Sequence, residues 1–170
     1  LKIGGDNLYL QNAAHDENYL EGVTNGAVSL YHNNVVKIAT SAAGATITGT
    51  LDVVGNVTYS GGSLTTEDTL TDGATVTWDV TASPVAKVTL AGSRTLSAPS
   101  NPLGSGQYAS LLVIQDGTGS RTLTWNAAYE FKDDTAPTLT TTASKGDLFT
   151  FRYNGAKWLE VGRNQNLSLS

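Results

Sequence analysis

The feature that most constrains this chain is a long alternation of apolar and polar residues between Ala45 and Ser60. One parity of this segment is apolar or glycine. The other carries threonine, asparagine, serine and Asp52, with Val54 as the one apolar exception. Period two is the pattern of a strand with one buried face, but typical strands have only about five or six residues. The segment is therefore predicted to be a ribbon that needs a partner to cover its apolar face.

The partner of this ribbon is either another copy of the chain or the domain that follows it. Alone, the ribbon would be an exposed hydrophobic edge strand, which is prone to aggregation. Wound around copies of itself, it would turn its apolar parity toward a shared axis. Gly49, Gly55 and Gly61 recur every six residues, and regular glycines permit bends or close backbone approach. We therefore predict a homo-oligomeric stem, and the alternative is an ordinary edge strand packed on the next domain.

Residues 1–43 contain short strand candidates with no core of their own. The strands are expected at Asn7–Gln11, Asn18–Glu21, Ala27–Tyr31 and Val35–Ala39. Asn25-Gly26 and Asn33-Asn34 are turn signals, because asparagine and glycine tolerate a positive φ, and the second signal predicts a hairpin. Isolated hairpins are marginally stable in water. Residues 1–60 are together predicted to form an elongated, intertwined β stem.

The second half of the chain has the pattern of a separate all-β domain. Residues 61–72 are polar and begin with Gly, Gly and Ser, which is typical of a linker. Residues 73–163 contain six to nine short strand candidates, which predicts a compact antiparallel β-sandwich of the jelly-roll kind. Residues 164–170 are expected to be a tail. The side chains predicted to meet in the core are Val76, Trp78, Val80, Leu111, Val113, Leu123, Phe149, Phe151 and Tyr153.

A short sequence echo lies inside this domain. Gly92–Leu96 (GSRTL) is repeated as Gly119–Leu123 (GSRTL). The echo is either a small internal symmetry between two strands or a coincidence in a chain rich in serine and threonine.

Composition excludes several classes of function. The chain has 170 residues and no cysteine, so disulfides and thiolate metal sites are absent. Its net charge is −5 with only 15% charged residues and no Lys/Arg cluster, which argues against a nucleic-acid partner. No apolar run approaches the roughly 20 residues of a membrane span, so membrane insertion is not expected. Since the sequence begins at Leu1 and has no methionine, we expect it to be a piece of a longer or processed protein.

Two stretches resemble known modules of bacteriophage tail fibres. The segment Asn25–Val53, with YHNNVVKIAT and TGTLDV, is similar to a module repeated in tail fibres, especially of marine phages, and Glu17–Tyr31 fits the same family. The stretches Asp72–Val80, Arg121–Phe131 and Gly146–Gly162 resemble a domain found toward the C-terminus of phage tail and fibre proteins. The resemblance implies a homotrimer, a virion location and a role in reaching or recognising a host surface. It identifies no binding residue.

The search for a chemical site finds little. His15 and His32 lie in polar, turn-rich sequence, where a catalytic triad would lack a rigid frame. The acidic pairs Asp16-Glu17, Glu67-Asp68 and Asp133-Asp134 are adjacent in sequence, and adjacent strand residues point to opposite faces, unlike the paired carboxylates of glycosidases. Calcium at Asp133-Asp134 is conceivable, but a solvated turn is the better interpretation. We predict no catalytic residue, no metal site and no cofactor.

One aromatic residue is singled out as a receptor contact. Tyr129 stands beside the polar turn Lys132–Asp134 and is the aromatic side chain that the pattern places least clearly in the core. The predicted function is a trimeric, non-enzymatic tail fibre protein that contacts other virion tail proteins and a host-surface glycan or protein. The alternatives are a purely structural spacer, a polysaccharide-degrading tail spike, and a bacterial surface filament built from similar modules.

Overall fold

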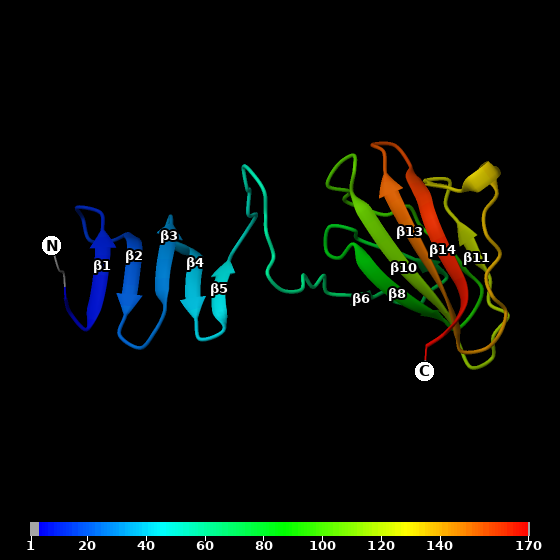
Figure 1. The fold of residues 1–170 in the computed structure, drawn as a ribbon, viewed down its shortest axis with the longest axis horizontal. Coiled ribbons are helices and arrows are strands. Elements are labelled where there is room, and N and C mark those ends of the chain that lie inside the picture. The colour runs from blue at the N-terminus through cyan, green and yellow to red at the C-terminus, as the bar shows by residue number, and fades with distance from the viewer. Residues whose placement is uncertain (1–3, 170) are drawn as a thin grey trace. The chain divides into compact units, whose positions relative to one another are not determined.

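A computed structural model describes residues 4–169, and their regular structure is β apart from one short 3-10 turn, Lys132–Asp134. The all-β prediction is confirmed. The chain divides into two units, Leu1–Ser60 and Gly61–Ser170, which are described separately (Figure 1). Within the described residues, no helix has the length and apolar character that crossing a membrane requires.

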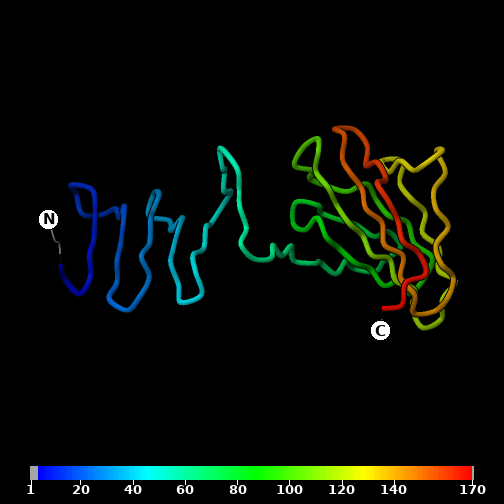
Figure 2. Tube along the Cα trace, viewed as in Figure 1, coloured from blue at the N-terminus to red at the C-terminus, as the bar shows by residue number. Residues whose placement is uncertain are grey.

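The N-terminal unit is a five-stranded antiparallel meander in which each strand pairs with the next one along the chain (Figures 1 and 2). Its predicted turns are confirmed: Asn25, Asn33 and Asn34 all have φ between 50° and 59°, the left-handed region that asparagine tolerates. The strands are β1 (Asn7–Gln11), β2 (Asn18–Val23), β3 (Val28–His32), β4 (Val35–Ser41) and β5 (Gly44–Ile47).

This sheet has no second layer of its own. Ser29 is the only buried residue among the described residues up to position 60. A sheet that is solvated on both faces gains little from the burial of apolar area, which is the main favourable contribution to folding. The N-terminal unit therefore has backbone pairing without a core.

Within the single chain, the predicted ribbon over residues 45–60 is not one continuous strand. Only its first residues belong to β5, and the last hydrogen bond to the sheet runs from Thr48 N to Lys37 O at 2.8 Å. Gly49 and Gly55 have φ of 118° and 138°, which bends the backbone away from an extended strand. Alternation sets which side chains share a face, but a strand also needs a neighbouring backbone, and residues 49–60 have no such hydrogen-bonded neighbour among the described residues.

The C-terminal unit is a short β-solenoid of about three turns. Each turn gives one strand to a larger sheet and one to a smaller sheet, and equivalent strands pair in parallel. In the larger sheet these are β6 (Asp68–Thr69), β8 (Val85–Leu90) and β10 (Tyr108–Gln115); in the smaller they are β7 (Thr75–Val76), β9 (Arg94–Leu96) and β11 (Leu123–Trp125).

The predicted antiparallel sandwich or jelly-roll over residues 73–163 therefore has to be corrected to a solenoid. The sequence echo does fall on neighbouring turns, but Arg94 pairs with Leu123 and not with its echo Arg121. The structural register is thus two residues away from the sequence repeat. The unit also takes β6 from the segment predicted as a linker, and its last strand reaches Ser168 in the segment predicted as a tail.

Three further strands complete the unit beyond the third turn. β13 (Lys145–Tyr153) pairs antiparallel with β10, and β14 (Trp158–Ser168) pairs antiparallel with β13 and parallel with the two-residue β12 (Tyr129–Glu130). Asn154-Gly155 lies in the turn of the hairpin that connects β13 and β14, with φ of 98° at Gly155, where asparagine and glycine are typical hairpin-turn residues.

The predicted core side chains do meet between the two sheets. Trp78, Phe149 and Phe151 are each at most 1% exposed. The Trp78 indole N–H also donates to the Ser83 carbonyl oxygen at 2.9 Å, so the polar atom of this buried ring is satisfied. The other predicted core residues that are buried are Val76, Val80, Leu111, Val113 and Leu123, and Tyr153 packs against the cluster half-buried.

Two ion pairs lie close together on the C-terminal unit. The Arg94 guanidinium contacts Asp72 at 2.6 Å, and that of Arg121 contacts Asp116 at 2.8 Å. Hydrogen bonds from Arg121, together with those from the N–H groups of Gly119 and Thr118, lower the pKa of Asp116 to about 2. The Arg94 guanidinium likewise lowers the pKa of Asp72.

The C-terminal unit is expected to lose stability in acid partly through Asp116. Its folded-state pKa of about 2 lies below the usual 3.8, so the stabilisation is present above the unfolded value and is lost as the pH falls toward the folded value. Calorimetric melting between pH 5 and about 2 should show a falling midpoint, and Asp116→Asn should make that fall shallower. Asp133→Asn, at a carboxylate outside the observed ion pairs, should leave the slope unchanged; equal slopes for Asp116→Asn and the parent would contradict the assignment.

Candidate functional site

One face of the N-terminal sheet carries an aliphatic side chain from every strand. The register places Leu10 opposite Leu20, Leu20 opposite Leu30, Leu30 opposite Ile38, and Ile38 opposite Ile47. Residues directly opposite in an antiparallel sheet point to the same face, so these five side chains form one continuous row, called here the aliphatic row. Leu10, Leu30, Ile38 and Ile47 are between 38% and 50% exposed.

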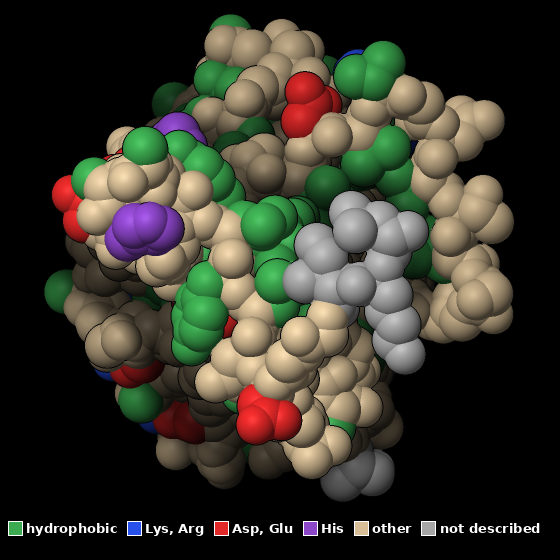
Figure 3. All heavy atoms as spheres, turned by 90° about the vertical axis from the view of Figure 1, so that its left-hand side faces the viewer, with side chains coloured by type: hydrophobic (Ala, Val, Ile, Leu, Met, Phe, Trp, Pro, Cys, Tyr) green, Lys and Arg blue, Asp and Glu red, His purple; other side chains and the backbone are tan. Residues whose placement is uncertain are grey.

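More apolar residues extend this face on one side of the row. Leu8 and Val28 are each paired with Gly22, and they are 38% and 47% exposed. A space-filling view shows hydrophobic side chains at the surface next to a histidine, and both histidines of the chain belong to this unit (Figure 3). The sheet thus leaves much of its apolar face in contact with solvent.

The opposite face of the same sheet mixes polar and tyrosine side chains with a few apolar ones such as Val23. Tyr9 lies opposite Glu21, which lies opposite Ser29. The Tyr31 hydroxyl donates to Glu21, and the Glu21 carboxylate raises the pKa of Tyr9 and of Tyr31. The sheet is therefore amphipathic, with a more polar face and an uncovered aliphatic face.

The segment that crosses the boundary between the two units is also exposed and carries large apolar side chains. Every residue from 42 to 69 is exposed, and residues 49–65 form no hydrogen bond with other described residues. The large exposed side chains here are Leu51 (63%), Val53 (42%), Val54 (100%), Val57 (52%), Tyr59 (66%) and Leu64 (90%). Exposed apolar stretches of this kind are typical of surfaces that another molecule covers.

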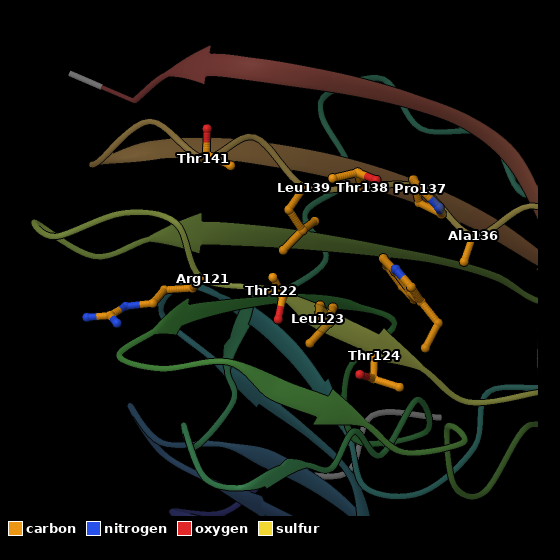
Figure 4. Close-up of a pocket in the computed structure, with 10 residues that line it drawn as sticks. Arg121, Thr122, Leu123, Thr124, Ala136, Pro137, Thr138, Leu139 and Thr141 are labelled. Atoms are coloured by element: carbon orange, nitrogen blue, oxygen red, sulfur yellow. The ribbon is translucent and has the colours of Figure 1, made fainter.

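The C-terminal unit has a groove of about 390 Å³ beside the smaller sheet, called here the β11 groove. One side is β11 with the residues just before it, and the other is the loop that leads into β13. Figure 4 shows labelled side chains of both segments around it. The lining residues are Arg121, Thr122, Leu123, Thr124, Trp125, Ala136, Pro137, Thr138, Leu139 and Thr141.

The floor of the β11 groove is the free edge of the smaller sheet. Arg94 N donates to Thr122 O at 2.9 Å, so the residues of β11 that face β9 are those with even numbers. Because backbone groups alternate along a strand, the N–H and C=O of Leu123 and Trp125 point the other way, toward the loop. They have no hydrogen-bond partner among the described residues.

A buried carboxylate fixes the loop that faces this edge. Asp147 is 2% exposed, and it accepts hydrogen bonds from Thr140 N at 2.7 Å and Asn166 N at 2.9 Å. The Gln165 side-chain amide donates to Thr138 O at 2.7 Å. At the closed end of the groove, Ser120 N donates to Thr141 O at 2.8 Å. Hydrogen bonds within the protein thus fix both sides of the groove, and no ligand is needed to order them.

The one charge in the groove lining is paired with a carboxylate outside it. Arg121 is its only charged residue, and two of its guanidinium nitrogens bond to Asp116 at 2.8 to 3.2 Å. The remaining polar groups are threonine hydroxyls and the backbone edge of β11. These groups can donate and accept hydrogen bonds, but they offer no charge to attract an ionic ligand.

Trp125 forms the inner end of the lining and is the only partly exposed tryptophan. Its ring packs edge-on against Phe149 at 4.9 Å and against Phe131 at 5.0 Å, while Trp78 and Trp158 are each 1% exposed. The Trp125 indole N–H is buried without a partner among the described residues.

Tyr129, the predicted receptor contact, lies in the core. It is 4% exposed, packs against Trp125 and Phe151, and has a pKa raised by burial. The premise that it is the least clearly buried aromatic residue is wrong, because Tyr129 lies in β12 and pairs with Trp158 of β14. Its role as a receptor contact stays a prediction, and it would require this side chain to leave the core.

The titratable residues considered for chemistry do not converge. His15 and His32 are both exposed, and among residues 4–169 there is no group of three or more His, Asp or Glu side chains placed to hold a metal ion. Asp133 and Asp134 occupy the exposed 3-10 turn with positive φ. The arrangement offers surfaces for binding more than groups for catalysis.

Sequence analysis did not identify the aliphatic row or the β11 groove. A signal for the row was present, since Leu10, Leu20 and Leu30 recur every ten residues with turn signals between them. The groove had no comparable signal. It depends on a strand edge left free by the solenoid and on a loop held by Asp147, and both require the tertiary fold.

The comparison with known families agrees with this architecture. Residues 70–158, more than half of the 170-residue chain, match the family described as "Putative phage tail fibre C-terminal domain". No curated protein and no solved structure matches the chain significantly. The resemblance of the second half to a C-terminal domain of phage fibres is thereby confirmed, and the chain belongs to the phage tail fibre C-terminal domain family.

Proposed function

We propose that this chain is part of a trimeric phage tail fibre that is carried on the virion and helps it attach to a host surface. The observation that supports the trimer proposal is the aliphatic row, which the N-terminal sheet exposes across all five strands without a covering layer. The N-terminal unit supplies no covering layer of its own, because Ser29 is its only buried residue among those described.

Copies of the same chain are the simplest cover for this face. Three identical amphipathic sheets can turn their aliphatic rows toward one axis and keep their polar faces in solvent. A closed assembly of this kind hides the apolar faces and limits further growth, which an open arrangement does not do. The exposed segment 49–65 would be ordered in the same step, because neighbouring chains can supply the hydrogen-bond partners that it lacks.

Three C-terminal units on one fibre would also explain attachment. Weak contacts with a host glycan or protein add up when several sites bind at once. Two other functions differ in what they predict. A purely structural spacer would form the trimer, contact other virion tail proteins and bind no host surface. A polysaccharide-degrading spike would release reducing ends from host glycans.

The trimer is tested by the mass of the chain in solution. Three chains of 17.7 kDa give about 53 kDa, and light scattering during size exclusion should return that value. A monodisperse species of 17.7 kDa would overturn the proposal. A mass that grows with concentration would instead indicate an open filament.

A further inference from the structure

We propose that the β11 groove is a binding site for a neutral oligosaccharide, an inference that rests on the proposed attachment function and names its site. The groove combines a preformed shape, a polar lining without an unpaired charge and one accessible indole. The groove lies beside the core cluster, which includes Leu123 and Leu139 of the lining and against which Trp125 packs.

The shape of the groove fits a small extended ligand. Its volume of about 390 Å³ falls in the range of about 300 to 1,000 Å³ that is common for ligand sites. The hydrogen bonds of Asp147 and Gln165 hold the facing loop in place before any ligand arrives. Because this wall is already ordered, the entropic cost of ligand binding is lower.

The lining chemistry favours a ligand with many hydroxyl groups. Leu123 and Trp125 present unpaired backbone donors and acceptors, and Thr124 and Thr138 add hydroxyls that do both. A sugar hydroxyl can also donate and accept, so it can match either kind of group. The apolar side chains of Leu139 and Pro137 face the C–H surfaces that a sugar ring carries.

The absence of an unpaired charge in the lining favours neutral over acidic glycans. Acidic ligands need a cation that is free to bind them. Arg121, the only charged residue of the lining, is already held by Asp116. The groove therefore favours neutral sugars.

An extended peptide is the other ligand that a free strand edge can bind. The free edge of β11 is only three residues long, which is shorter than the roughly five or six residues of a typical strand. Beyond it the groove closes where Ser120 bonds to Thr141. A short, closed edge suits sugar residues better than an added strand.

The test uses the full chain on a panel of neutral and acidic bacterial surface oligosaccharides. We expect neutral members to bind, and Thr124→Arg or Thr138→Arg to weaken that binding by about tenfold or more, because each fills the groove from an exposed position. Thr89→Arg is the matched control, since Thr89 is exposed on β8 and does not line the groove. It should leave the affinity within about twofold.

Tryptophan fluorescence gives a second readout. Trp78 and Trp158 are each 1% exposed, so quenching by acrylamide should come from Trp125, and a bound neutral oligosaccharide should reduce it. Trp125→Phe, which keeps an aromatic ring in the core, should remove this protected fraction. Circular dichroism melting of each variant separates lost binding from lost folding.

Several outcomes would overturn the inference. These are unchanged binding by a folded Thr124→Arg chain, binding of acidic members alone, no binding of neutral members at millimolar concentration, or loss of peptide binding alone in the groove variants. A chain of trimer mass that fails the glycan test would overturn this site and leave the trimer proposal intact. A monomer that binds neutral glycans through the groove would overturn the trimer proposal and support this site.

Discussion

Replacing Leu30 by aspartate is expected to leave the chain monomeric at concentrations where the parent is a trimer. Leu30 lies at the centre of the aliphatic row and is 41% exposed in the single chain. Covering the rest of this side chain is worth about 1 kcal/mol per copy, or about 3 kcal/mol per trimer. An unpaired carboxylate buried near the axis adds several kcal/mol per copy. Together these terms should weaken assembly by about a thousandfold or more.

The control for this change lies on the opposite face of the same sheet. Thr46 is exposed on β5 and points away from the row, because it lies opposite Ala39 and is a neighbour of Ile47. Thr46→Asp adds the same charge without burying it, so the trimer mass should be unchanged. If light scattering shows both variants as trimers, the aliphatic row is not the interface; if both are monomers, the effect is one of charge and not of location.

Removal of the Asp147 side chain is expected to cause the largest loss of stability among polar substitutions in the C-terminal unit. Asp147→Ala takes away the acceptor for Thr140 N and Asn166 N, at a site that is 2% exposed. Hydrogen bonds to a charged group are each worth about 1.5 to 3 kcal/mol, so the free energy of unfolding should fall by about 3 to 5 kcal/mol. The corresponding drop in melting temperature is about 10 to 20 °C.

Calorimetry of the full chain measures this effect. Asp133→Ala removes an exposed carboxylate from the 3-10 turn, and its melting temperature should stay within about 2 °C of the parent. Since Asp147 also holds the loop of the β11 groove, oligosaccharide affinity should fall in Asp147→Ala even below its melting temperature. Equal stability of Asp147→Ala and the parent would show that water or another group satisfies these N–H groups.

Local features of the fold were predictable from the sequence because their causes are local. Asn33-Asn34 and Asn154-Gly155 specify their hairpins through the φ values that those residues tolerate. The apolar alternation around Trp78 and Phe149 specifies which side chains face the core, and all of them do so. In each case the deciding interaction lies within a few residues of the signal.

The arrangement of the strands was not predictable in the same way. An alternating strand has the same pattern whether its neighbour is parallel or antiparallel, so residues 73–163 were expected to form a sandwich and instead form a solenoid. Arg94 and Arg121 illustrate the limit, because their shared motif lies on adjacent turns but two residues out of register. The burial of Tyr129 depends on the same long-range pairing, through β12 and β14.

The uneven distribution of the core implies an order of assembly. The C-terminal unit has its own buried cluster, so it can fold as a single chain at a rate that does not depend on concentration. The meander β1–β5 has only Ser29 buried among its described residues. In the proposed trimer its stability would come from encounters between chains, and its ordering would be a second- or higher-order step. During synthesis of many copies in one cell, the C-terminal units would therefore be folded before the N-terminal units have associated with one another. The slow, concentration-dependent step in making such a fibre would then be the assembly of the N-terminal unit, which lacks a hydrophobic core of its own.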